Sequence, residues 1–315
     1  MTQKREKMVN NDTKQARSVI LRVKETAERG RCMSLENEIT GVDHLGILTG
    51  DLKRDVAWYE EKLGFEKLQQ RIVVMNGRTE IALLRKGNLV LELVEPAGRL
   101  KEEAKLRGAG KWDHFAMEAP ELEKEAALAE EKGLKVHPST PDGLTWYEHL
   151  GEKGVRGINF YGPGGEVLEF CREEAVDYHG KTGLPGWSHL ALKVENLERT
   201  EAFYGKMGFQ VRSKGYLPTP EGDIRIHYLE KCGFVMEVLE MTGSGLEELK
   251  QRKEGRLDHI ALRVKDIREA FDGARKNSYP LLNHTIQELP LLEKGIRFFF
   301  VSGPDGEKVE FVEKI

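Results

Sequence analysis

The sequence predicts an α+β fold made of four copies of one module, in which a strand and a helix are followed by about three further strands. A short phrase centred on a histidine recurs four times along the chain, at His44, His114, His189 and His259. The first and third of these histidines are 145 positions apart, as are the second and fourth. Such self-similarity at a fixed offset indicates a tandem duplication in which each unit is itself double.

Each module is expected to begin with the strand that carries its histidine, because those phrases are short runs of apolar and β-branched residues. An amphipathic helix follows, and the first and third helices end at Gly64 and Gly208, which suit a left-handed helix terminus. Turn dipeptides such as Asn76-Gly77 then separate the remaining short strands. The four predicted helices span residues 51–63, 121–132, 196–207 and 267–276.

Two consecutive modules are predicted to form one domain. Helix-like segments over residues 99–106 and 245–253 are expected to bridge successive modules within each half. A charged helix over residues 13–29 is expected to serve as a packing or dimerisation arm. The predicted divisions are an N-terminal helical extension (1–40), a first domain (41–173), a linker rich in glycine (174–186) and a second domain (187–315).

Composition limits the classes of partner. The 49 Lys and Arg residues against 53 Asp and Glu residues give a net charge of -4, which disfavours binding to nucleic acid. No apolar run is long enough to span a membrane, and Met1 to Asn10 lack an apolar signal core. The three cysteines are widely spaced, so neither a disulfide framework nor a zinc–thiolate cluster is expected. A cytoplasmic protein without nucleic-acid or membrane partners is therefore expected.

Four glutamates lie inside otherwise apolar strands, at Glu92, Glu169, Glu237 and Glu310. A buried carboxylate without a partner costs several kcal/mol, so each needs a cation or a hydrogen-bond donor. Together with the four histidines they supply two imidazoles and two carboxylates per half. This donor set suits Zn, Ni, Co, Fe or Mn and leaves two positions of an octahedral ion open. One or two divalent ions per chain are predicted.

The module order and the His, Glu, His, Glu set resemble the vicinal oxygen chelate superfamily, which includes glyoxalase I, methylmalonyl-CoA epimerase, extradiol dioxygenases and bleomycin resistance proteins. The resemblance covers about residues 41–315 and implies two glyoxalase-like domains with cupped mixed sheets. Some four-module relatives pair modules one with four and two with three, and both pairings stay open because each yields two His and two Glu. The implied metal ligands are His44, Glu92, His114 and Glu169 in the first half and His189, Glu237, His259 and Glu310 in the second.

The resemblance implies a lyase or isomerase of the glyoxalase or epimerase type, acting on a small molecule with vicinal oxygens. A metal holding a carbonyl and its neighbouring oxygen acidifies the C–H between them, and a glutamate takes the proton. By position, Glu169 and Glu310 are the predicted bases, with Glu92 and Glu237 as the alternative candidates. The alternatives are an extradiol dioxygenase, against which Glu92 and Glu237 count because they fill a position that would be open, and a non-enzymatic binder of the drug-resistance type.

Substrate contacts are predicted from a few further residues. Arg156 and Arg297 occupy equivalent strand positions and could clamp a carboxylate or phosphate. The polar and aromatic loop over residues 136–151, and His227 with Tyr228, could line the two pockets. The identity of the substrate, the choice of metal and the presence of a homodimer are left open by the sequence.

Overall fold

The computed structural model describes residues 35–74 and 77–315, and residues 35–315 form one compact unit. The helical arm predicted over residues 13–29, and most of the predicted extension over residues 1–40, lie outside the described residues. The remaining part of that extension forms the short helix α2 (Leu35–Glu38) and the first residues of strand β1 (Ile39–Leu48).

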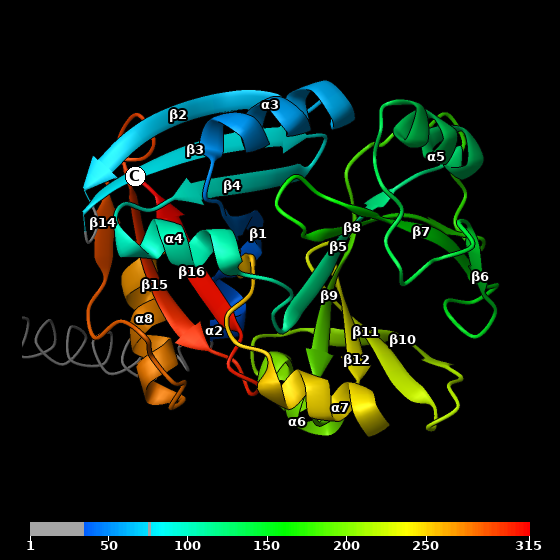
Figure 1. The fold of residues 1–315 in the computed structure, drawn as a ribbon. Helices are drawn as coiled ribbons and strands as arrows, with labels where there is room; N and C mark the ends of the chain where they lie inside the picture. Colours follow the sequence, from blue (N-terminus) through cyan, green and yellow to red (C-terminus); the bar gives the residue numbers. More distant parts are fainter. Residues whose placement is uncertain (1–34, 75–76) are drawn as a thin grey trace, which may run out of the picture. The chain divides into compact units, whose positions relative to one another are not determined.

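The four predicted modules are all present, each with a strand, a helix and three further strands (Figure 1). The helices agree closely with their predicted bounds. The first module contains β1 (Ile39–Leu48), α3 (Leu52–Leu63), β2 (Glu66–Val74), β3 (Arg78–Lys86) and β4 (Leu89–Glu95). The second contains β5 (Trp112–Glu118), α5 (Leu122–Glu131), β6 (Thr145–Tyr147), β7 (Val155–Tyr161) and β8 (Val167–Glu173). The third contains β9 (Trp187–Val194), α6 (Leu197–Gly205), β10 (Gln210–Leu217), β11 (Ile224–Lys231) and β12 (Phe234–Glu240). The fourth contains β13 (Leu257–Val264), α8 (Ile267–Lys276), β14 (Gln287–Leu289), β15 (Ile296–Ser302) and β16 (Lys308–Lys314).

The strands form two mixed eight-stranded sheets, which confirms the predicted α+β class. Sheet A has the order β14-β15-β16-β13-β1-β4-β3-β2, and sheet B has the order β10-β11-β12-β9-β5-β8-β7-β6. In the middle of each sheet two histidine strands run antiparallel, β1 with β13 and β5 with β9. Each of these strands pairs on its other side with a parallel glutamate strand, as β1 does with β4.

This topology settles which modules combine. Sheet A joins the first module to the fourth, and sheet B joins the second to the third. The predicted division into residues 41–173 and 187–315 therefore does not describe the sheets, because each sheet takes one module from each half. Duplication makes all four histidine strands alike in their apolar pattern, so the pattern alone did not specify which strand pairs with which.

Local sequence signals account for the helix ends. The side chain of Asp51 accepts a hydrogen bond from the Arg54 backbone N–H and begins α3, and Gly64 ends it in the left-handed conformation with φ of 69°. The buried face of α3 packs Val56 and Tyr59 into the core. The same capping pattern recurs at α6, where the Asn196 side chain accepts from the Arg199 N–H.

Two bridge helices connect successive modules, α4 (Arg99–Leu106) and α7 (Gly243–Gln251), close to the predicted bridges. The segments that follow them lie against each other, since Arg256 N–H donates to the Gly108 carbonyl at 2.9 Å. A Cβ on Gly110 would lie 2.6 Å from the backbone nitrogen of Gly255, so this crossing requires glycine. The bridges of the two halves therefore meet backbone to backbone.

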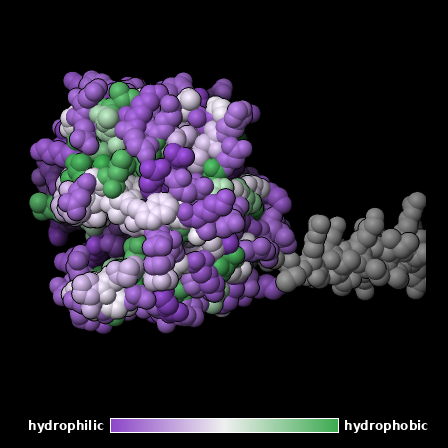
Figure 2. All heavy atoms as spheres, turned by 90° about the vertical axis from the view of Figure 1, so that its right-hand side faces the viewer, coloured by the Kyte–Doolittle hydropathy of each residue, from purple (hydrophilic) through white to green (hydrophobic). Residues whose placement is uncertain are grey.

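The surface is mostly hydrophilic on the face that Figure 2 presents, with hydrophobic side chains in small groups. None of the helices formed by the described residues has the length and apolar character needed to cross a bilayer.

A buried tyrosine–glutamate pair anchors the turn before the last strand of sheet A. The Tyr204 hydroxyl donates to Glu307 Oε1 at 3.0 Å, and the Asp305 backbone N–H donates to Glu307 Oε2 at 2.9 Å. Burial raises the pKa of Glu307 to about 7, because these donors offset only part of the cost of burying the charge. The matching Glu166, which accepts from Tyr59, also has Arg256 nearby.

We predict that Glu307 makes folding stability fall as pH rises. A carboxyl whose pKa is higher in the folded state than in the unfolded chain stabilises the folded state. This contribution is complete below the pKa of the unfolded chain and is lost as pH rises through about 7. Between pH 5 and pH 8 the expected loss is about 2.5 kcal/mol. Denaturant unfolding of the wild type and Glu307→Gln at both pH values measures it. The variant should lack this loss, and parallel pH profiles of the two proteins would contradict the assignment.

Candidate metal centres

The first cluster, site A, lies in the middle of sheet A and consists of His44, Glu92, His259 and Glu310. The Nε2 atoms of His44 and His259 lie 3.3 Å apart. Glu310 Oε2 lies 3.1 Å from His44 Nε2 and 3.3 Å from His259 Nε2. Glu92 Oε2 lies 3.5 and 3.7 Å from the same two nitrogens. All four side chains are buried, and their nitrogen and oxygen atoms converge on one point.

Site B repeats this arrangement in sheet B with His114, Glu169, His189 and Glu237. The two Nε2 atoms lie 3.4 Å apart. Glu169 Oε2 lies 3.4 Å from His114 Nε2 and 3.2 Å from His189 Nε2. Glu237 Oε2 lies 3.5 Å from each imidazole. The Tyr228 hydroxyl donates to Oε1 of Glu237 at 2.7 Å. Among the described residues of site A, no hydroxyl donates to a glutamate in this way.

All eight residues predicted as metal ligands thus lie in two clusters of two His and two Glu. Their grouping corrects the expectation that each half of the chain holds one complete set. His44 and Glu92 of the first module join His259 and Glu310 of the fourth, because β1 and β13 are neighbours in sheet A. The other two predicted first-half ligands, His114 and Glu169, lie in sheet B instead.

The residues present fit a divalent metal ion. Three-residue groups within each cluster offer ligand atoms that lie within 4.8 Å of one another. Glu310 Oε2 is buried and accepts no hydrogen bond, although two imidazole nitrogens lie close to it. Glycine at position 46 makes room for the cluster, because a Cβ there would lie 2.0 Å from Cε1 of His259. Imidazole and carboxylate together suit a borderline first-row metal.

Three aspartates that were not predicted as site residues orient the imidazoles. Asp43 lies 3.2 Å from Nδ1 of His44, and Asp258 lies 3.2 Å from Nδ1 of His259. Asp113 lies 3.1 Å from Nδ1 of His114. A carboxylate that accepts from Nδ1 leaves Nε2 as the nitrogen available to a metal. The signal was present in the sequence, since an aspartate directly precedes three of the four histidines.

His189 differs from the other three histidines. Its Nδ1 lies 3.3 Å from the Ser188 hydroxyl oxygen, where the others face aspartate. The buried thiol of Cys171 also belongs to a group with Glu169 and His189 whose ligand atoms lie within 4.8 Å of one another. In site B, one of the two imidazoles is therefore held by a neutral hydroxyl and not by a carboxylate.

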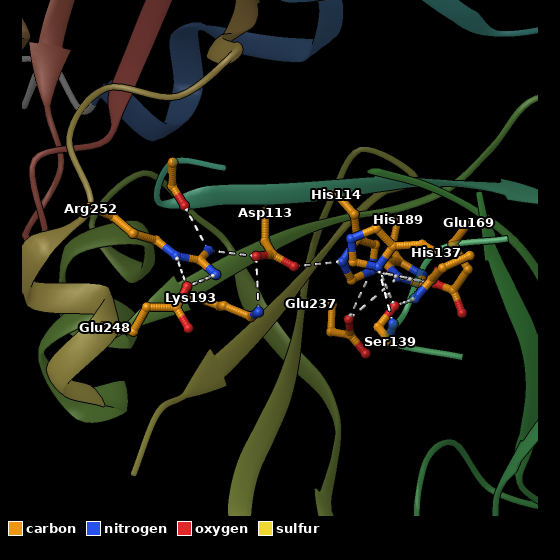
Figure 3. Close-up of polar contacts among 12 residues, drawn as sticks. Asp113, His114, His137, Ser139, Glu169, His189, Lys193, Glu237, Glu248 and Arg252 are labelled. Carbon is orange, nitrogen blue, oxygen red and sulfur yellow. Dashed lines mark hydrogen bonds and ion pairs between the residues drawn. The ribbon is translucent and has the colours of Figure 1, made fainter. Parts of the chain in front are cut away.

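Arginines from the two bridges hold two of the aspartates that orient the imidazoles. Arg107, directly after α4, donates to Asp258 at 2.8 Å, and Arg252, directly after α7, donates to Asp113 at 2.7 Å. Figure 3 shows Asp113 lying between His114 on one side and Arg252 with Lys193 on the other. Arg252 also donates to the Gly110 carbonyl at 3.1 Å, so the crossing of the bridges and the orientation of the histidines share the same side chains.

The electrostatics of the clusters favour charged side chains. Burial alone would lower the pKa of His114 and His259, but their aspartate and glutamate neighbours raise the pKa of each to about 9. Burial would likewise raise the pKa of Glu169, but His114 and His189 lower it to about 2. Imidazolium cations thus balance the buried carboxylates in each cluster when no metal is bound.

Each cluster opens into a cavity. The cavity of site A has a volume of about 270 Å³ and is lined by Glu92, His259 and Glu310 of the cluster. The cavity of site B has a volume of about 620 Å³ and is lined by all four residues of its cluster.

The residues predicted to line the pockets lie only partly in these cavities. From the predicted loop, His137 and Tyr147 line the cavity of site B, whereas Trp146 is half-exposed and His149 stacks on Tyr216. Of the predicted second pair, Tyr228 lines the same cavity. His227 is paired with Glu201 and does not line it.

The geometry does not support the predicted substrate-binding role of Arg156 and Arg297. Arg156 forms ion pairs with Glu123 and Glu174, and Arg297 forms one with Glu288. Neither arginine lines the cavity of site A or site B. Side chains alternate along a strand, so an arginine next to an inward-facing residue points to the opposite face of the sheet. Both arginines therefore form ion pairs outside the two cavities.

Comparison with known proteins agrees with this architecture. The model of the family described as "Glyoxalase/Bleomycin resistance protein/Dioxygenase superfamily" matches residues 43–145 and 188–300, which is more than half of the chain. The chain belongs to this superfamily. The match confirms the resemblance inferred from the sequence, and its two segments begin next to His44 and His189, at the start of each duplicated unit.

Individual relatives of this superfamily are distant. YwbC of Bacillus subtilis (strain 168), described as uncharacterized, is 27% identical over 126 residues, covering 40% of this chain and 95% of that protein. The crystal structure of glyoxalase I from Zea mays has a TM-score of 0.64 and 21% identity, covering 87% of this chain and 92% of that chain. A protein from Bacillus subtilis subsp. subtilis str. 168, described as a proposed dioxygenase, has a TM-score of 0.56 and 16% identity, covering 88% and 86%. The structural likenesses support the fold.

We predict that the two bridge arginines act on different metal centres of this superfamily member. Arg107→Ala removes the arginine from Asp258 of site A and leaves Lys308 as its cation, and Arg252→Ala removes the arginine from Asp113 of site B and leaves Lys193. Loss of such an outer partner lowers metal affinity by about tenfold or more. Calorimetric titration with Co²⁺ measures this in proteins that keep one site, made by replacing both histidines of the other site with alanine. Each arginine variant serves as the control for the other, and equal losses at both sites would point to general unfolding.

We further predict that metal affinity rises with pH up to about pH 9. Below that value His114 and His259 carry protons in the metal-free protein, and an incoming ion must displace them. Affinity should therefore fall about tenfold per pH unit for each proton displaced as the pH decreases. Titration with Co²⁺ at pH 7.5, in buffers that differ in ionisation enthalpy, counts the protons released. Release of fewer than about one proton per ion would contradict the charge state described above.

Proposed function

We propose that the chain is an enzyme dependent on a divalent metal ion, of the glyoxalase or epimerase type. It isomerises a small substrate with two neighbouring oxygens by removing a proton next to a carbonyl. The observation that carries this proposal is the convergence of two His and two Glu on one point beside a cavity, found twice among the described residues. A bound Zn, Ni, Co, Fe or Mn ion would supply Lewis-acid polarisation of the substrate oxygens.

The hydrogen bonds around the glutamates support a division of roles. In site B, the Tyr228 hydroxyl donates to Glu237, whereas Glu169 contacts the imidazoles of His114 and His189. Glu169 is therefore the carboxylate proposed to accept a proton from the substrate. Glu310 occupies the equivalent place on the last strand of its module, and its Oε2 has no donor. Glu169 and Glu310 are the proposed general bases.

The remaining residues of each cluster position these bases. The aspartates at Nδ1 fix the tautomer and the orientation of His44, His114 and His259, so that their Nε2 atoms face the glutamates. The buried floor keeps bulk water away from the bases, which strengthens their interaction with a developing charge.

The presence of two His and two Glu in each cluster disfavours both alternative functions, the ring-cleaving dioxygenase and the drug-binding protein. A ring-cleaving dioxygenase uses two His and one carboxylate, with three positions left open. Glu92 and Glu237 are well placed to fill one of those positions. A binder that sequesters a drug has no need of two imidazoles and two carboxylates converging on one point. We also propose that each chain binds one or two divalent ions and that the protein is cytoplasmic. A homodimer is the assembly that we propose to test.

We predict that Glu169→Gln and Glu310→Gln each remove the activity of one site and together abolish it. Exchange of the C–H proton of hydroxyacetone in D₂O, followed by NMR with Zn²⁺-loaded protein, should slow by about 100-fold or more in the double variant, because its general bases are gone. Metal content is measured alongside, since glutamine keeps an oxygen at each position. Glu173→Gln is the matched control on the strand of Glu169, because Glu173 pairs with Arg212 away from the cluster. Wild-type exchange in the double variant would overturn the proposal.

A further inference from the structure

The two cavities differ in chemistry although the clusters at their floors match. Beyond its cluster, the cavity of site A is lined mainly by aliphatic and phenyl side chains, among them Ile81, Leu289, Ile296, Phe298 and Phe300. These side chains belong to or pack against an apolar cluster in sheet A. The site A cavity, at about 270 Å³, therefore favours an apolar group beside the metal cluster.

The cavity of site B is larger and more polar. Its volume is about 620 Å³, and its lining includes the polar side chains of His137, Ser139, Tyr147, Asn159 and Tyr228. Two cations, Lys193 and Arg252, also line it, but both are paired with Asp113. The uncharged polar groups are therefore the ones available to a substrate.

The residue opposite each glutamate shows this difference most directly. In site A, Glu310 pairs across the strands with Phe300, and Glu92 pairs with Leu83. In site B the cross-strand partner of Glu169 is Asn159. These matched positions flank the proposed bases, so the same place next to the reacting atoms is apolar in one site and amide-bearing in the other.

Asn159 presents an unused acceptor in the wall of the cavity. Its side chain is buried, with 7% exposed, and its Oδ1 has no hydrogen-bond partner. The neighbouring network fixes the amide orientation. Nδ1 of His137 accepts from the Ser139 backbone N–H at 3.2 Å and lies 2.8 Å from the Ser139 hydroxyl, which donates to it. The Ser139 oxygen is then left to accept, and the Asn159 amide nitrogen donates to it at 2.7 Å. A buried acceptor left in this way needs a donor from a ligand.

We propose that the two sites serve two classes of substrate. Site A takes a small oxygen chelate that carries an aliphatic or aryl group. Site B takes a larger, hydroxyl-bearing chelate of the sugar type, with one hydroxyl donating to Asn159 Oδ1. This inference rests on the proposed function, because both substrates use vicinal oxygens to reach the cluster.

The test uses two hydroxamic acids, which present the same pair of chelating oxygens with different substituents. Benzohydroxamic acid carries an aryl group, and gluconohydroxamic acid carries a chain of hydroxyls. Each is titrated by calorimetry into Zn²⁺-loaded protein that keeps a single site. The protein with site A alone carries His114→Ala and His189→Ala, and the protein with site B alone carries His44→Ala and His259→Ala. We expect site A to prefer the aryl probe and site B to prefer the hydroxylated probe, each by about tenfold.

Matched substitutions then test the two walls. Asn159→Leu in the protein with site B alone should weaken the hydroxylated probe by about tenfold and leave the aryl probe unaffected. Phe300→Asn in the protein with site A alone should improve binding of the hydroxylated probe. The second variant keeps the test decisive if the first fails to fold, which circular dichroism would reveal.

The outcomes separate this inference from the proposed function. Equal preference of both sites, or an Asn159→Leu variant with unchanged binding of both probes, overturns the division of substrates while leaving metal chelation intact. Failure of both probes to bind either Zn²⁺-loaded site overturns the proposed function and the inference together.

Discussion

Burial of carboxylates inside apolar strands is the constraint on which the rest of this structure depends. Glu92, Glu169, Glu237 and Glu310 are each at most 6% exposed, where an unpaired charge would destabilise the fold by several kcal/mol. The histidines opposite them supply the compensating charge, and removing one partner would leave the other buried and unpaired. The same groups that would bind a metal are therefore also groups that the metal-free fold has to neutralise.

This compensation extends outward in layers. Each histidine of site A is held by an aspartate, and each aspartate by cations, Asp43 by Arg263 and Asp258 by Arg107. In site A the charges therefore alternate in sign from the glutamates through the histidines and aspartates to the outer cations. The bridges thereby connect the backbone crossing at Gly110 and Gly255 to the orientation of the imidazoles.

Local features were predictable from the sequence, and the pairing of distant strands was not. The bounds of α3 and α8 follow from capping residues and periodicity, and the histidines and glutamates could be found because polar groups recurred within apolar strands. The partner of His44 could not be chosen, since all four histidine strands have the same pattern. Recurrence was a poor guide at Arg156 and Arg297, because both form ion pairs away from the cavities. The sequence has an amide at Asn159 and a phenyl group at the equivalent Phe300. This difference could be assigned to the two sites only from the strand register, which places each residue opposite a glutamate.

The nested order of the modules has a consequence for how the chain folds. Sheet B uses only residues between Trp112 and Glu240, a continuous stretch. Sheet A pairs Leu45 with Ile260, so its centre closes only after that stretch has been traversed. Closing so large a loop costs more entropy when the intervening chain is unfolded than when it is compact. During synthesis sheet B can form while the last module is still being made, and its folding brings the two halves of sheet A close together.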